Sequence, residues 1–146
     1  MTETIGPFTA QQLNALAQFL PDFESPGFSP GAMRGMTPNA DGSLSFPYAV
    51  LSDKVEAFIA AIYDNGWVVG HFDWPAWAGT KEAARLRDDE TALVGATPEQ
   101  VAKLMTVIIR QDRFAEGTVL NAFETGLVLR IVRRIDALAQ ATTDDP

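Results

Sequence analysis

The chain has 146 residues, a net charge of -8 and no cysteine. Its length and its 47% of hydrophobic residues suit one globular domain over residues 1–146, and the missing cysteines exclude disulfides and thiolate metal sites. The acidic balance argues against general nucleic-acid binding, and without an apolar run of ~20 residues or a signal segment we expect a cytoplasmic protein that spans no membrane.

A first helix is predicted from Thr9 to Pro21. Thr9 can cap the amide of Gln12, whose side chain can bond back to Thr9, and this reciprocal pair is typical of a helix start. Proline lacks the amide that a helix interior needs, so Pro21 is expected to end the helix. The buried stripe of this helix is expected to comprise Leu13, Leu16, Ala17 and Leu20.

The segment 21–47 differs in composition, because it holds five prolines and four glycines. It is longer than the roughly 12–15 residues usual for a structureless loop, so it either closes over a site as a lid or wraps the core. We favour the wrap, because Phe23, Phe28 and Met33 are spaced as anchors along it.

One short strand is predicted over residues 44–51, interrupted at Pro47. Its expected partner is the extended piece 67–69, in the only sheet that the sequence indicates. Between these pieces, Ser52 can cap a helix over residues 53–65.

Three further helical stretches are expected after Gly66. They are residues 74–88, broken at Gly79–Thr80; a helix opened by Thr97, Pro98 and Gln100; and residues 113–140, broken at Gly117 and Gly126. The tail 141–146 is expected to fray. The predicted fold class is therefore mainly α, a single compact domain of five to six helices with at most a small two-stranded β element.

The stretch GHFDWPAW, residues 70–77, combines the single histidine with a carboxylate and two tryptophans. With Asp73 as N-cap, Phe72 and Trp77 occupy the two positions of a hydrophobic staple, and Trp74 shares a face with Trp77. We favour this structural role for Asp73 over a catalytic one, since a carboxylate bonded to helix amides is a poor general base.

His71 remains an acid–base candidate by residue type, although packing or capping is the more common role of a lone histidine. A second histidine and the HExxH spacing are both missing from the sequence. We therefore expect no metal ion and no cofactor.

A second polar cluster spans residues 109–117, in a region (102–134) whose six basic and three acidic residues could meet an anionic ligand. In the structural interpretation, which we favour, Asp112 caps the next helix and Arg113 pairs with Glu116. In the chemical interpretation, Arg110 and Arg113 bind a phosphate or carboxylate and Glu116 acts as acid or base. Glu124 would then supply a second carboxylate.

The segments YDNGW, FDWPAW and IIRQDRFAEG…AFETGL together resemble a family of small bacterial domains, family 6508 of the domains of unknown function. The similarity covers about residues 13–135. It implies a fold group rather than a reaction. Similar domains can be attached to macrodomain-type proteins, which handle ADP-ribose, so the resemblance also points towards nucleotide-linked chemistry. The residues it implicates are Asp73, Trp74, Arg110, Asp112, Arg113 and Glu116.

Two functions follow from these patterns. The favoured one is a non-catalytic interaction or regulatory module that binds a protein partner or forms a homo-oligomer. The other is a small enzyme or ligand-binding domain for a nucleotide-like or other anionic compound. Its site would lie between Trp74/Trp77 and Arg110/Arg113, with the segment 21–47 as lid. The sequence contains no phosphate-binding loop and no nucleophile motif, so we lean against an enzyme.

Overall fold

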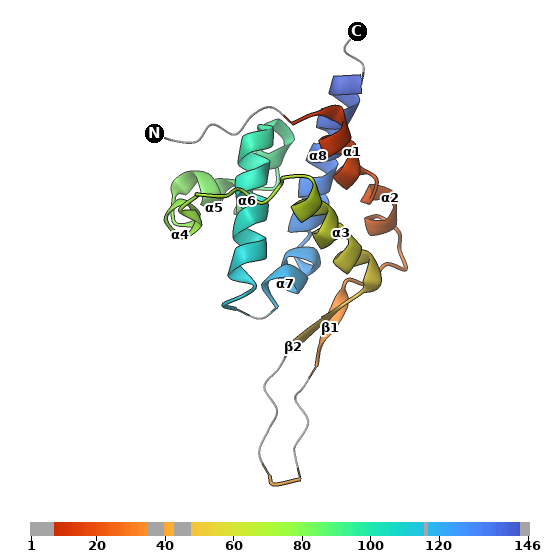
Figure 1. Cartoon of the computed structure of the whole chain (residues 1–146), viewed down its shortest axis with the longest axis vertical. Helices are drawn as coiled ribbons and strands as arrows, with labels where there is room; N and C mark the ends of the chain where they lie inside the picture. The colour runs from red at the N-terminus through yellow and green to blue at the C-terminus, as the bar shows by residue number, and fades with distance from the viewer. Residues whose placement is uncertain (1–7, 35–39, 43–47, 116, 144–146) are drawn as a thin grey trace.

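The computed structural model describes residues 8–34, 40–42, 48–115 and 117–143. These residues form a mainly helical fold with a small two-stranded antiparallel sheet, as predicted (Figure 1). The elements are α1 (Ala10–Ala17), α2 (Leu20–Phe23), β1 (Gly31–Arg34), β2 (Tyr48–Leu51), α3 (Asp53–Asp64), α4 (Trp74–Ala78), α5 (Lys81–Asp88), the short 3-10 helix η1 (Ala92–Gly95), α6 (Pro98–Gln111), α7 (Thr118–Glu124) and α8 (Leu127–Thr143). No helix in these ranges is both long and apolar enough to cross a bilayer.

The helix starts form as the sequence predicts, because each is encoded within four residues. At α1, Gln12 N donates to Thr9 Oγ1 at 3.2 Å and Thr9 N donates to Gln12 Oε1 at 2.8 Å. The same two bonds join Thr97 and Gln100 at the start of α6. Ser52 caps α3 through its hydroxyl. These caps satisfy amides that have no partner inside their helices.

The helix breaks also fall where they were predicted, at Gly79–Thr80 and at Gly126, whose φ of 84° suits glycine. These breaks, together with the short α2, give more helical segments than the five or six expected. The prediction that Pro21 ends the first helix is wrong. Helix α1 ends at Ala17, and Pro21 lies in the first turn of α2, where an amide would have no helical partner anyway. At the other end, α8 continues to Thr143.

The predicted pairing of the strand with residues 67–69 is wrong, because β2 pairs instead with β1. Gly31, at a φ of 137°, allows the two backbones to approach, and a Cβ there would collide with the Val50 carbonyl. The 67–69 piece has other partners, since Val69 N donates to the side chain of Thr106 in α6. Residues 43–47 of the predicted strand lie outside the described residues.

The segment 21–47 behaves in two ways. Its first part packs on the core, where the Phe23 ring lies 5.0 Å from Phe58 and 5.1 Å from Phe123, centroid to centroid, and Phe28 packs against the same cluster. The expected anchor Met33 is instead 43% exposed on β1. The β1–β2 hairpin extends away from the helical body (Figure 1). Residues up to Phe28 thus follow the predicted wrap, and the hairpin does not.

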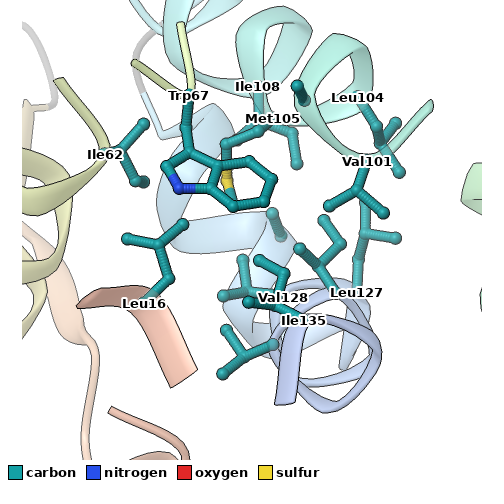
Figure 2. Packing of buried hydrophobic residues seen from close by; sticks show 14 of the residues in the cluster. Leu16, Ile62, Trp67, Val101, Leu104, Met105, Ile108, Leu127, Val128 and Ile135 are labelled. Carbon is teal, nitrogen blue, oxygen red and sulfur yellow. The ribbon is translucent and has the colours of Figure 1, made fainter. Parts of the chain in front are cut away.

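The buried hydrophobic residues form one cluster, in which α6 and α8 are the central helices. Trp67 lies in the middle of it, with Ile62 and Leu16 on one side and Met105 and Ile108 of α6 on the other (Figure 2). Trp67, together with its neighbours Leu16 and Ile62, is almost completely buried. The extended residues after α3 therefore insert a core side chain rather than adding a strand.

Candidate functional site

Asp73 occupies the N-cap of α4, as the sequence predicts. Its Oδ1 accepts a hydrogen bond from Ala76 N at 3.2 Å, and the side chain lies at the surface. Pro75 follows in the first turn, which needs no amide there. The carboxylate is therefore engaged by the start of a helix.

Replacing Asp73 by alanine is expected to destabilise the protein by about 1 kcal/mol, because the cap bond is lost. That corresponds to a fall in Tm of roughly 2–4 °C for a chain of this size. Asp73→Asn keeps an oxygen that can accept from Ala76 N, so it is expected to melt close to the wild type. Thermal melts of both variants test this. Equal melting of the alanine and asparagine variants would contradict a capping role.

The staple and its neighbours connect α4, α5 and α6. The Phe72 and Trp77 rings lie 5.9 Å apart, as the staple predicts. Trp77 Nε1 donates to Glu82 Oε2 at 3.2 Å, and Gln100 Nε2 donates to Glu82 Oε1 at 2.8 Å. The bond from Gln100, then that from Trp77 and the charges of Lys103 and Arg85, hold the pKa of Glu82 below its usual range despite partial burial. Glu82 is thus an ionised structural link.

Trp74 and Trp77 do not make a common face. Trp77 is buried, whereas Trp74 stacks on the exposed Phe114, with ring centroids 6.2 Å apart and planes 27° apart. The FDW and RQDRF motifs therefore meet through one ring pair. His71 lies at the surface with a φ of 49°, a left-handed conformation uncommon for residues other than glycine.

Two charged residues of the RQDRF motif make hydrogen bonds, one to a backbone amide and one to a side chain at the surface. Asp112 Oδ1 accepts from Val119 N at 3.1 Å, so it binds the first turn of the next helix, as the structural interpretation predicts. That helix begins at Thr118 rather than near Arg113, and its N-cap is Gly117. Arg113 Nη2 donates to the Tyr63 hydroxyl at 3.3 Å. The predicted pair of Arg113 with Glu116 lies outside the described residues, because Glu116 is one of those not described. Glu124 is exposed at the end of α7.

Arg110 lies on the face of α6 that covers residues 67–72. One and two turns earlier on this face, Thr106 binds Val69 N and Lys103 Nζ lies 5.7 Å from the Phe72 ring. The Arg110 Nε is buried and makes no hydrogen bond with the part of the chain that the structure describes. Trp77 lines the cavity described next and Arg110 does not, so the two residues do not face a common site.

A cavity of about 520 Å³, open to solvent, adjoins Trp77 and is lined by residues of α4, α5, α6, α7 and the start of α8. Of the predicted site residues that the structure describes, Trp77 alone lines it, and Trp74, Arg110 and Arg113 do not. Its polar lining residues were not predicted from the sequence: Arg87, Asp88, Gln111, Thr118, Asn121, Thr125 and Arg130. These residues come from four separate helices and form no sequence motif. The excess of basic residues over 102–134, which includes Arg130, was the sequence feature that pointed to an anion site in this region.

Within the described ranges, no three histidine or carboxylate side chains come together in a way that could hold a metal ion.

Comparison with known families identifies the group of proteins to which this fold belongs. The chain belongs to the family of unknown function DUF6508, whose model matches residues 8–141. This match contains both motifs and confirms the resemblance inferred from them. Comparisons with curated proteins and with solved structures give no significant match.

Proposed function

We propose that this protein is a non-catalytic interaction domain that assembles with a second copy of itself through its β-hairpin. The non-catalytic part is supported by the two motif carboxylates, because Asp73 and Asp112 each accept a hydrogen bond from a backbone amide at a helix start. The observation that carries the assembly is the exposed outer face of the hairpin.

The strand register defines the two faces of the hairpin. Residues opposite each other share a face, so Met33 lies with Ala49, next to the pair formed by Gly31 and Leu51. This is the inner face, because Leu51 packs against the core. Pairing and alternation place the other four residues on the outer face, namely Ala32, Arg34, Tyr48 and Val50.

The outer face is accessible and, apart from Arg34, mostly apolar. Tyr48 is 50% exposed and Val50 is 44% exposed. A two-stranded hairpin is marginally stable alone and gains from further packing. Burying this face against a partner would remove apolar surface from water and would also stabilise the hairpin.

Charge restricts where a second copy could bind. Each chain carries a net charge of -8, so most approaches of two copies are repulsive. The outer face holds no carboxylate, and its one charged residue is Arg34, opposite Tyr48. In a two-fold symmetric dimer the same surface of each copy forms the interface, so the outer face of one hairpin would pack against the outer face of the other.

Analytical ultracentrifugation of Val50→Lys tests the proposal, with Val94→Lys as the matched control. Val94 is 73% exposed on η1, so the control makes the same change away from the hairpin. The wild type and Val94→Lys are expected to form a concentration-dependent dimer, and Val50→Lys is expected to stay monomeric because two added charges would face each other. A wild type that is monomeric from micromolar to millimolar concentration, or a Val50→Lys dimer as stable as the wild type, would overturn the proposal.

A further inference from the structure

The cavity between α4–α5, α6, α7 and α8 contains a cationic group without a full set of partners. Arg130 lines the cavity, and its Nη2 donates to the Arg87 carbonyl at 3.3 Å. Its Nη1 is buried and has no hydrogen-bond partner among the described residues. A guanidinium stays charged at all physiological pH values, so this N–H lacks an acceptor.

The nearest carboxylate in the lining is already engaged. Asp88 accepts from Arg87 through both oxygens, at 2.9 Å from Nε and 3.0 Å from Nη2. Among the lining residues the charged side chains are Arg87, Asp88 and Arg130. These three side chains sum to one positive charge, that of Arg130, while Asp89 outside the lining also interacts electrostatically with Arg130.

The remaining lining resembles a small-molecule site. Trp77, Leu104 and Ile108 supply an apolar wall, while Gln111 and Asn121 supply amides that make no side-chain hydrogen bond in the described structure. The volume of about 520 Å³ falls within the roughly 300–1,000 Å³ of typical ligand pockets, which likewise combine apolar walls with a few polar groups.

We propose that this cavity binds a small organic anion, whose oxyanion accepts from Arg130 and whose apolar body lies against Trp77. A carboxylate or phosphate would pair with the Arg130 guanidinium that lines the cavity, since a guanidinium binds oxyanions with strong, directed hydrogen bonds. The amides of Asn121 and Gln111 are placed to bond polar substituents of such a compound. Among the described residues, none of the hairpin lines this cavity, so the proposal does not rest on self-association.

Titration calorimetry with benzoate and phenyl phosphate tests the proposal, with benzyl alcohol as the neutral control. Both anions share the required chemistry, and their comparison separates a carboxylate site from a phosphate site. The wild type is expected to bind at least one anion saturably and to bind benzyl alcohol at least about tenfold more weakly. Absence of binding by both anions, or equal binding of the neutral alcohol, would overturn the proposal.

Variants locate the bound anion. Arg130→Gln is expected to weaken binding about tenfold or more, because the charged donor is lost. Arg133→Gln is the matched control: Arg133 lies nearly one turn further along α8, lines only a smaller neighbouring cavity that Arg130 shares, and pairs with Glu24 at 3.0 Å. It should bind as the wild type does. Binding that Arg130→Gln leaves unchanged would contradict the site.

A second variant covers the case in which Arg130→Gln does not fold. Asn121 is exposed on α7 and lines the larger cavity but not the smaller one, so Asn121→Leu should fold and obstruct the site. It is expected to weaken anion binding at least about tenfold, because it removes the amide and adds bulk. Binding equal to that of the wild type would place the anion elsewhere and overturn the assignment.

Discussion

Replacing Trp67 by alanine is expected to lower the free energy of unfolding by about 3–5 kcal/mol, the largest effect that we predict for one side chain. Trp67 is fully buried at the centre of the core, between α1 and α3 on one side and α6 on the other (Figure 2). Its ring also stacks on Phe8, with centroids 3.9 Å apart. Alanine would leave a cavity that several helices would have to close together, and rigid helices cannot do so fully.

The indole also makes a polar contact that a smaller side chain cannot replace, since Trp67 Nε1 donates to Gln12 O at 3.1 Å. The fall in Tm should be roughly 6–20 °C, measured by calorimetry or circular dichroism. Trp74→Ala is the control, because Trp74 is only partly buried and stacks on an exposed ring. If both alanine variants melted at the same temperature, Trp67 would not hold the central position that we assign to it.

Thr106→Val is expected to cost about 1–3 kcal/mol, although it nearly preserves volume. Among the described residues, Thr106 is the only buried side chain classed as polar. Its Oγ1 donates to Ala102 O at 2.7 Å and accepts from Val69 N at 2.9 Å. Valine keeps the packing and removes the acceptor, so the Val69 amide loses its partner at the point where the 67–69 piece meets α6.

Denaturant titration of Thr106→Val and Thr125→Val measures this cost. Thr125 makes the same kind of bond to its own helix, to Ala122 O at 3.4 Å, but its side chain is exposed and binds no distant amide. The control should therefore unfold within about 0.5 kcal/mol of the wild type. An equally small effect at Thr106 would mean that water can replace its hydroxyl at Val69.

The parts of the fold that could be predicted are those in which cause and effect lie close in sequence. The Thr9–Gln12 pair is complete within four residues, and Asp73 is followed directly by the helix that it caps. Gly126 has the positive φ that its place between two helical patterns indicated. Such features depend on the conformation of a few neighbouring residues, so the residue types in a short window predict them.

The sheet could not be predicted in the same way, because strand pairing depends on contacts between separate segments. In the sequence, Trp67–Val69 have the residue types of a strand, whereas the β1 segment contains a glycine, which strands usually lack. In the structure this glycine, Gly31, has a φ of 137°. The decisive fact is that Thr106 supplies a partner to Val69 N, and this partner is 37 residues away in the sequence. That bond joins 67–69 to α6 rather than to a strand.

The candidate site was predicted only in part, for a related reason. The role of Asp73 as a cap was predictable from its position directly before a helix, whereas Asp112 binds an amide seven residues further on, in a helix that begins later than predicted. The convergence of Trp77 with Arg130 was not predictable, because helices α4 and α8 are brought together by the packing of the whole core. The predicted site of Trp74 and Trp77 with Arg110 and Arg113 does not form one cavity, because Trp74 stacks on Phe114 and Arg113 binds Tyr63.

Gly117 connects the two surfaces proposed above. It adopts a φ of 96°, and Met33 Sδ of the hairpin lies 3.2 Å from the position that a Cβ would take there. The next residue, Thr118, lines the cavity. One short piece of backbone is therefore in contact with the hairpin on one side and adjoins the anion site on the other. Should an occupant of the cavity displace this turn, thermodynamic reciprocity would require dimer formation to alter the occupant's affinity by the same factor.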